Sequence, residues 1–360
     1  MSSSPVKSST AKALPEQMAH GPLFVISMWR SGSSLLYALL NKHPKVGLMY
    51  EADLMLLGSV FRKPRPLRDW ANRWEFWNQA FSRHGLDVAE FADNHDDFPE
   101  AFAAAHQAFA RKKGASIWGD KSPNYYDRLQ EMAEIFPAAR FIIVWRDPLG
   151  TANSILRAAQ SGNSYFQRKG STLRGLFGNE VFRQQCRWLC AHDKPVLEVN
   201  YEDLVANPAQ VMQQVCSFLH LEYSDRLTSL AGADRSAIYE GKHHSLVKGT
   251  EIVSRPRANV AGEALRNKID RYVKLWQRQS AGLWPAFHQF EPSEVAITGA
   301  WEHAKDKFSY HALRTYDRFT ASCFSAAPLG LLQRYRDRKY RTPAASANEI
   351  PQTAAPPKEA

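Results

Sequence analysis

Short apolar runs alternate with longer segments of helical periodicity over the first 220 residues of the chain. The segments PLFVISM (22–28) and ARFIIVWRD (139–147) are nearly continuous in apolar residues, as expected of strands buried on both faces. Shorter runs predict a strand at 115–121 and, within 195–204, a strand that runs into a loop. The segment PKVGLMY (44–50) returns the chain from the first helix to the region of the sheet.

Helical patterns fill the intervals between these runs. One apolar stripe directly follows the first strand: Leu35, Leu36, Leu39 and Leu40. Pro44 ends the helix that carries this stripe. Further helices are expected at 125–136, 148–160, 207–219 and 262–280. Because strands alternate with helices, the sequence predicts an α/β fold with a doubly wound, central parallel sheet that is flanked by helices.

Composition divides the chain into segments of different character. Residues 1–20 are small and polar and predict a flexible tail, whereas residues 21–300 predict one domain. A segment at about 60–113, rich in Trp, Phe, His and Ala, is expected to interrupt this domain as a helical insert. A basic helical extension is expected at 301–341, and the Ala- and Pro-rich residues 342–360 are expected to be disordered.

The charge balance favours an anionic partner. The chain has 46 Lys and Arg against 36 Asp and Glu, which gives a formal net charge of +10. Such an excess suits a nucleotide, an acidic glycan, a nucleic acid or a membrane surface, and it does not choose among them. The basic run from Arg334 to Arg341 fits a solvated helix end, which the pattern favours, or peripheral contact with an anionic membrane or glycan.

The cysteines favour a reducing compartment. The four cysteines lack the paired spacing of metal ligands, so we expect buried, reduced thiols and no metal: Cys186, Cys190, Cys216 and Cys323. No apolar run reaches the ~18 residues that cross a bilayer, and the first 21 residues have no apolar core of signal-peptide length. We therefore expect a soluble, cytoplasmic protein. The sequence does not indicate its oligomeric state.

A polar turn joins the first strand to the first helix: Arg30, Ser31, Gly32, Ser33 and Ser34. The first N–H groups of a helix lack partners within it, and a glycine lets an anion approach the backbone closely. Arg30 adds a planar guanidinium group that can donate two hydrogen bonds to one phosphate, and the serines add hydroxyl donors. The turn lacks the Gly-Lys-Ser/Thr of a triphosphate-binding loop. It fits an anion site or an ordinary capped helix with a solvated arginine.

Two other strand ends carry cations. Arg146 follows the strongest strand, and Ser154 lies eight residues later on the next helix, a spacing that suits one phosphate held from two sides. The alternative is that Arg146 pairs with Asp147 or another acid and that Ser154 faces solvent. Lys121 closes the second predicted strand. Ligands of parallel sheets bind beyond the carboxyl ends of the strands, so Arg30, Lys121 and Arg146 together predict a ligand with more than one phosphate.

Glu51 is the candidate general base. It follows the segment that returns to the sheet, and this placement brings it near the same edge. A carboxylate would repel a polyanion, which makes it odd as a binding group but reasonable as a base for an acceptor hydroxyl. The alternative is an exposed acid that caps the helical segment ADLMLL.

Taken together, these motifs resemble those of sulfotransferases that use 3′-phosphoadenosine-5′-phosphosulfate (PAPS), closest to the protein-tyrosine and carbohydrate sulfotransferase branch. WRSGSSLLYALLNKHPKV (29–46), followed by Glu51, resembles the 5′-phosphosulfate loop and catalytic glutamate of that branch. FIIVWRDPLGTANSIL (141–156) resembles its 3′-phosphate strand and helix. DKSPNYY (120–126) resembles the segment with the catalytic lysine, and YEDLVANP (201–208) a motif that follows the fourth strand.

The resemblance implies a P-loop-like three-layer fold and transfer of a sulfuryl group from PAPS to a hydroxyl or amine, without a metal. It implies catalytic roles for Glu51, Arg30 and Lys121. It implies donor contacts from the following residues: Arg30, Ser31, Gly32, Ser33, Ser34, Arg146 and Ser154. A late loop at 243–257 resembles the family only loosely and adds Lys248, Ser254 and Arg255. The chain departs from the family at Trp29, where a proline is usual, and in having Ser-Ser for Thr-Thr.

The acceptor is expected to be a glycan, a glycolipid or a small hydroxylated metabolite, and no nucleic-acid partner is expected. Two other classes of function stay open. A P-loop kinase-like phosphotransferase requires Gly-x4-Gly-Lys-Ser/Thr and an acidic strand end for magnesium, whereas the third predicted strand ends in Arg146. A non-catalytic polyanion-binding module suits the net charge but has no need of Glu51.

Overall fold

The computed structural model describes residues 21–57, 81–87, 98–162, 166–167, 170–238, 247, 249–253, 262–279, 300–328, 330–331 and 334. The tails expected at 1–20 and 342–360 lie outside these residues, as do parts of the expected insert. The expected limits of the domain stay a prediction.

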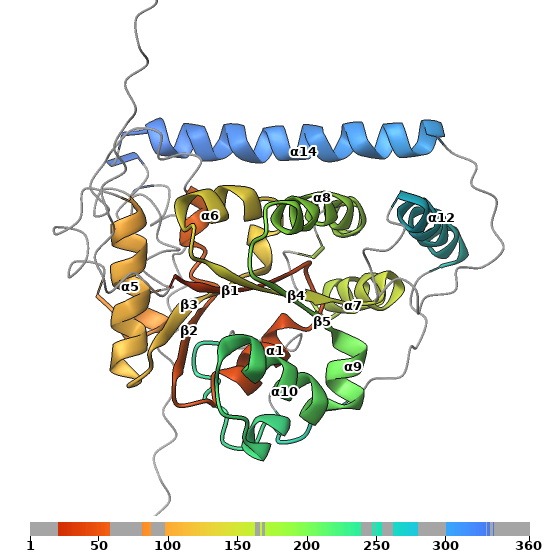
Figure 1. Ribbon diagram of the computed structural model, residues 1–360. Coiled ribbons are helices and arrows are strands. Elements are labelled where there is room, and N and C mark those ends of the chain that lie inside the picture. The colour runs from red at the N-terminus through yellow and green to blue at the C-terminus, as the bar shows by residue number, and fades with distance from the viewer. Residues whose placement is uncertain are drawn as a thin grey trace, which may run out of the picture.

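Five parallel strands form the central sheet, in the order β2-β3-β1-β4-β5 (Figure 1). Their bounds are β1 Leu23–Ser27, β2 Val46–Tyr50, β3 Ile117–Lys121, β4 Arg140–Trp145 and β5 Val196–Asn200. Alternate residues of β1 enter two separate cores, Phe24 and Ile26 on one face and Leu23 and Val25 on the other. Both faces are therefore buried, which explains the nearly continuous apolar runs in the sequence.

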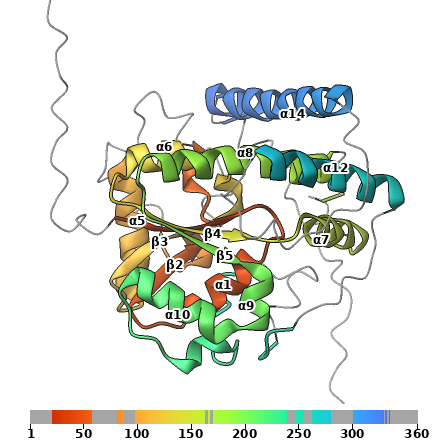
Figure 2. The same cartoon turned by 45° about the vertical axis from the view of Figure 1, so that its right-hand side comes forward.

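Helices cover both faces of the sheet and give three layers (Figures 1 and 2). One face carries α1 Ser33–Leu40, α9 Tyr201–Ala206 and α10 Pro208–Leu219. The opposite face carries α5 Phe98–Lys112, α6 Leu129–Ile135, α7 Pro148–Gln160, α8 Ser171–Ala191 and α12 Glu263–Gln279. Helix α14, Ala300–Ala326, lies outside α8 as the outermost element of that side. The predicted α/β fold is confirmed.

Short 3₁₀ segments complete the described structure: Leu54–Leu57, Pro123–Tyr125 and Asp225–Thr228. The strand expected within 195–204 ends at Asn200, and the short helix α9 follows it where the sequence predicted a loop. The side chain of Asn200 accepts a hydrogen bond from the N–H of Glu202 at 2.9 Å and so begins α9. The segment at 44–50 proves to contain a full edge strand, β2, which pairs with β3.

The cysteines only partly follow the expectation. All four are free thiols, but only Cys186 and Cys216 are buried, whereas Cys190 and Cys323 are exposed. The two exposed thiols lie on solvent-facing positions of α8 and α14, which the sequence pattern did not distinguish from core positions. Among the helices of the described ranges, none is long and apolar enough to cross a membrane. The cytoplasmic location stays a prediction.

Candidate functional site

The turn after β1 has an unusual backbone path at two positions. Arg30 and Gly32 both adopt left-handed conformations, with φ of 66° and 93°, and Ser31 between them is buried. A Cβ atom on Gly32 would lie 2.1 Å from Cδ2 of Tyr201, the first residue of α9. Only glycine satisfies both the conformation and this close approach. The sequence suggested room for an anion as the reason for glycine, whereas the ring of Tyr201 supplies a second reason.

The two serines that begin α1 have different partners. Ser27 donates a hydrogen bond to the hydroxyl of Ser33 at 2.8 Å, which leaves the Ser33 proton available for another acceptor. Ser34 Oγ lies 2.8 Å from the hydroxyl of Tyr50 and accepts a hydrogen bond from Lys121 Nζ at 3.2 Å. Within the described ranges, no side chain caps the first turn of α1. Its backbone N–H groups therefore face the edge of the sheet where the strands end.

Three predicted residues meet on one side of this edge, which we call the arginine side: Arg30, Arg146 and Ser154. Arg30 Nε donates to Ser154 Oγ at 3.1 Å, and Arg146 Nη1 donates to the carbonyl oxygen of Arg30 at 2.9 Å. The guanidinium of Arg146 lies over the ring of Tyr201, 4.3 Å from its centroid. Arg30 thus lies between the two residues that the sequence expected to act as a pair.

The arginine side concentrates positive charge in a place that water reaches poorly. Burial lowers the pKa of the Arg30 guanidinium, and the neighbouring charge of Arg146 lowers it further, although Tyr50 acts in the opposite direction. Asp147, which the sequence offered as a partner for Arg146, caps α7: its carboxylate accepts from two backbone N–H groups of the first turn, at 3.0 and 3.2 Å.

The other side of the edge carries carboxylates, and we call Glu51, Asp53 and Lys121 the carboxylate side. Lys121 Nζ lies 2.6 Å from Glu51 Oε1, and the N–H of Glu51 donates to the carbonyl oxygen of Lys121 at 2.8 Å. The Lys121 ammonium also lies 4.3 Å from the ring centroid of Tyr50. The Lys121 side chain is 1% exposed and that of Glu51 15% exposed, so only the carboxylate meets solvent.

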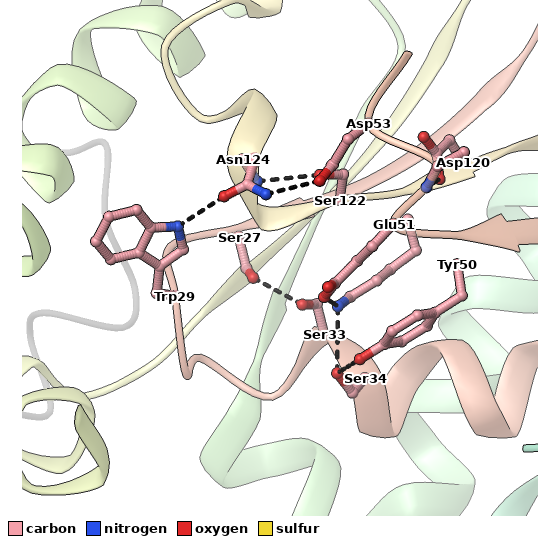
Figure 3. A network of polar contacts seen from close by, with 12 residues as sticks. Ser27, Trp29, Ser33, Ser34, Tyr50, Glu51, Asp53, Asp120, Ser122 and Asn124 are labelled. Carbon is pink, nitrogen blue, oxygen red and sulfur yellow. Dashed lines mark hydrogen bonds and ion pairs between the residues drawn. The ribbon is translucent and has the colours of Figure 1, made fainter. Parts of the chain in front are cut away.

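Asp53 is a buried acid that the sequence analysis missed. Its carboxylate accepts hydrogen bonds from Ser122 Oγ and from Asn124 Nδ2, the latter at 2.9 Å (Figure 3). Asn124 Oδ1 in turn accepts from the indole N–H of Trp29 at 3.0 Å. The network therefore joins the loops that follow β1, β2 and β3. Trp29, which replaces the usual proline, has a specific partner here.

Asp53 has an unusual backbone conformation and a raised pKa. Arg30, Glu51 and Asp53 all have positive φ, of 66°, 47° and 56°. Such conformations are unfavourable for these residue types and gather where surrounding structure holds them, often at functional sites. Burial raises the pKa of Asp53 to about 7, and the charge of Glu51 raises it as well. The spacing Glu-Ala-Asp directly after a strand was the available signal in the sequence.

The structure brings eight of the predicted residues to one edge of the sheet: Arg30, Ser31, Gly32, Ser33, Ser34, Glu51, Lys121 and Arg146, with Ser154 on α7 beside them. Lys248, Ser254 and Arg255 lie outside the described residues. Two cations on one side and a solvent-accessible carboxylate on the other suit a reaction in which an anionic donor meets a group that must lose a proton.

Comparison with known proteins agrees with this fold. Residues 22–225, more than half of the chain, match the model of the Sulfotransferase family. The structure is similar to the sulfotransferase domain from the curacin biosynthetic pathway, with a TM-score of 0.51 and 17% sequence identity over 71% of this chain and 97% of that one. This likeness concerns the fold alone.

Curated relatives include protein-tyrosine sulfotransferases. The chain is 28% identical to protein-tyrosine sulfotransferase 1 of Danio rerio over 216 residues, 56% of this chain and 54% of that protein. It is 24% identical to protein-tyrosine sulfotransferase 2 of Gallus gallus over 275 residues, 73% of this chain and 62% of that protein. The chain thus spans little more than half the length of these relatives. Because the family model covers more than half of the chain, the chain belongs to the sulfotransferase family.

Proposed function

We propose that this protein transfers a sulfuryl group from PAPS to a hydroxyl or amine of an acceptor, with Glu51 as general base. The observation that carries the proposal is the division of one sheet edge into two sides. Arg30, Arg146 and Ser154 are joined by hydrogen bonds on one side, and Glu51 pairs with Lys121 on the other. Membership of the sulfotransferase family supports the reaction class.

The arginine side fits a donor with two anionic groups. Arg30 and Arg146 lie close enough for each charge to oppose the other, and burial lowers the pKa of Arg30. Two like charges in a partly buried place are unfavourable together, and an anion placed between them relieves that repulsion. The uncapped N-terminus of α1 adds N–H donors to the same place. By the family resemblance, Arg146 and Ser154 hold the 3′-phosphate, while Arg30, Ser33 and Ser34 hold the 5′-phosphosulfate.

The transfer is an in-line displacement at sulfur. The acceptor oxygen or nitrogen forms a bond to sulfur, the bond from sulfur to the 5′-phosphate oxygen breaks, and 3′-phosphoadenosine-5′-phosphate (PAP) leaves with the electron pair. The acceptor proton passes to Glu51. By analogy with phosphoryl transfer, negative charge develops on the leaving phosphate, where Arg30 and Lys121 stabilise it.

Lys121 connects the two sides. Its ammonium contacts Glu51 at 2.6 Å and Ser34 at 3.2 Å, so it reaches both the base and the beginning of α1. The Lys121 ammonium can therefore hold the Glu51 carboxylate and contact the leaving phosphate in the same side-chain conformation. Asp53, through Ser122 and Asn124, holds the loop that carries Glu51 against the loop that follows Lys121.

We propose a glycan, a glycolipid or a small hydroxylated metabolite as the acceptor. Protein tyrosine, which the names of the curated relatives give as their target, is the alternative. Titration with PAPS, ATP and an oligonucleotide tests the donor: tight binding of PAPS and weak binding of the other two is expected. Tight binding of ATP without binding of PAPS would refute the proposal. Transfer of labelled sulfate from PAPS to a panel that includes a tyrosine peptide then identifies the acceptor class.

A further inference from the structure

Helix α14 exposes a line of aromatic side chains to solvent. Trp301 is 83% exposed, Phe308 76%, Tyr316 64% and Phe319 65%. Trp301, Phe308 and Phe319 are spaced by seven and eleven residues, close to two and three turns of helix, so they lie along one face. From Trp301 to Phe319 the helix rises by roughly 27 Å. Single exposed aromatic residues are ordinary, whereas several large aromatic side chains aligned on one exposed face mark an interaction surface.

The opposite face of α14 carries the acids of the helix and packs on the domain. The three acids of the helix all pair with cations of α8 or α12. Glu302 lies 2.7 Å from Arg271, Asp306 2.5 Å from Lys268 and Asp317 3.0 Å from Arg174. The helix is thus inverted relative to the usual amphipathic arrangement, in which the apolar face is buried.

Two further contacts fix the orientation of α14. The hydroxyl of Tyr310 lies 2.7 Å from that of Tyr126, and His303 Nε2 lies 2.9 Å from Glu180. Both inward residues come from the face opposite the aromatic line. Figures 1 and 2 show the helix lying lengthwise across the outside of the molecule, with α8 between it and the sheet. The aromatic line therefore points away from the domain.

We propose that this outer face of α14 docks on an anionic lipid bilayer. The rings of Trp301, Phe308 and Phe319 enter the interface between headgroups and acyl chains, where aromatic side chains are favoured. Lys305 and Lys307 are exposed on the same helix and face the anionic headgroups. The aromatic rings and the lysines supply an apolar and an electrostatic attraction, and stable attachment generally needs two such signals.

Charge decides between a lipid surface and a second copy of the chain. The acids of α14 are paired with the domain, so the charged side chains beside the aromatic line are lysines. Two copies that joined through this face would bring cationic surfaces together, at a cost from like-charge repulsion. An anionic bilayer offers both the apolar layer and the opposite charge. The net charge of +10 also favours an anionic bilayer over a second copy of the chain.

The test is co-sedimentation of the full chain with vesicles of phosphatidylcholine alone and of phosphatidylcholine with phosphatidylglycerol at 3:1. We expect binding to the anionic vesicles, at least tenfold stronger than to the neutral ones. We expect the double variant Trp301→Ser/Phe308→Ser to lose at least tenfold in affinity, and Lys305→Glu/Lys307→Glu to lose the preference for anionic vesicles. Cys190→Ser is the control, because Cys190 is an exposed side chain of α8 that belongs neither to α14 nor to the donor site, and its loss is expected to leave binding unchanged.

Three outcomes would overturn the proposal: no binding of the full chain to anionic vesicles, unchanged binding by the Trp301/Phe308 double variant, or a loss in Cys190→Ser equal to that in the double variant. Sedimentation velocity without vesicles tests whether the outer face of α14 binds a second copy of the chain instead. A concentration-dependent dimer that the double variant abolishes would assign the face to a second copy instead. Retained PAP binding in every variant shows that the domain is folded, and this readout is independent of the membrane contact.

Discussion

The two sides of the sheet edge differ in charge although they belong to one parallel sheet. The arginine side lies at the ends of the central strand β1 and its neighbour β4, and it holds two guanidinium groups and a hydroxyl. The carboxylate side lies at the ends of β2 and β3, and it holds Glu51 and Asp53 with one ammonium, that of Lys121. A site of uniform positive charge would bind an anion and do no more.

This difference shows how one edge of the sheet can bind the donor on one side and accept the acceptor's proton on the other. On the arginine side, two partly buried guanidinium groups that lie close together favour a polyanion. On the carboxylate side, Glu51 is kept beside the donor site by Lys121 and by the buried network around Asp53. Substitutions on one side should therefore change turnover, and substitutions on the other side should change donor affinity.

The largest effect is expected on the carboxylate side. Glu51→Gln removes the base while keeping the shape of the side chain, so turnover should fall by ~10²- to 10⁴-fold. The affinity for PAP should stay within about threefold, since Glu51 does not hold the donor. Steady-state rates with labelled PAPS and a PAP titration measure the two effects.

Glu202→Gln is the matched control for this substitution. Glu202 is another partly buried carboxylate at the same edge, where it accepts a hydrogen bond from the N–H of Asp147 at 3.3 Å, and burial raises its pKa. Its loss should have little effect on turnover. Equal losses in both variants would mean that the fall reflects charge at the edge rather than a base at position 51.

The next largest effect is expected on the arginine side. Arg146→Ala removes a cation that contacts Arg30 and Tyr201, so PAP affinity should weaken ~10- to 100-fold, as for a charged hydrogen-bonding group. Arg140→Ala, at the opposite end of the same strand, is the control and should leave the affinity unchanged. Similar weakening in both would show a general loss of charge or stability.

Gly32→Ala should lower the free energy of unfolding by ~2 kcal/mol, from a left-handed backbone and a clash with Tyr201. Gly162→Ala is the matched control: Gly162 has a similar φ of 89°, but a Cβ there meets nothing within 4 Å. Chemical unfolding of both variants separates the two causes. If they were destabilised equally, the packing of Tyr201 against the turn would contribute nothing.

The smallest effect is a pH dependence of stability from Asp53. Its pKa is about 7 in the folded protein and near 3.8 when unfolded, so the folded state binds a proton more tightly between these values. The stability from this proton is full below pH ~4 and is lost as the pH rises to about 7. From pH 6 to 7, the wild type should lose ~1 kcal/mol more stability than Asp53→Asn, as measured by urea unfolding.

Glu198→Gln completes this experiment, because burial raises the pKa of Glu198 to about 7 as well. Both substitutions should reduce the pH dependence of unfolding. Only Asp53→Asn should also change turnover, since Glu198 lies within β5 and Asp53 holds the loop of Glu51. An unchanged pH dependence in Asp53→Asn would show that the folded carboxyl titrates normally.

The pattern of apolar and polar residues was sufficient to predict the sheet and the edge where the candidate site lies. Continuous apolar runs identified β1, β3, β4 and β5, and the rule for parallel sheets placed Arg30, Lys121 and Arg146 on one edge. The segment of β2 was expected only to return to the sheet, because a short apolar run fits a strand or a connection equally well. Its pairing with β3 is what brings Glu51 beside Lys121.

Contacts between distant segments could not be predicted in this way. The network of Asp53, Asn124 and Trp29 depends on three loops that meet only in the folded chain, and each residue alone is unremarkable in sequence. The contact of Tyr201 with Gly32 is of the same kind. For α14, the sequence indicated a basic helix, but which of its faces is buried depends on cations of α8 and α12.

The central claim is that the arginine side binds the donor and the carboxylate side accepts the proton. Its most direct test is a titration of PAP into wild type, Glu51→Gln and Arg146→Ala, followed by single-turnover sulfate transfer in each. The account predicts that Glu51→Gln binds PAP within about threefold of wild type but transfers almost no sulfate. It predicts that Arg146→Ala binds at least ~10-fold more weakly and still transfers sulfate once PAPS is saturating. Full transfer by Glu51→Gln, or unchanged PAP binding by Arg146→Ala, would contradict it.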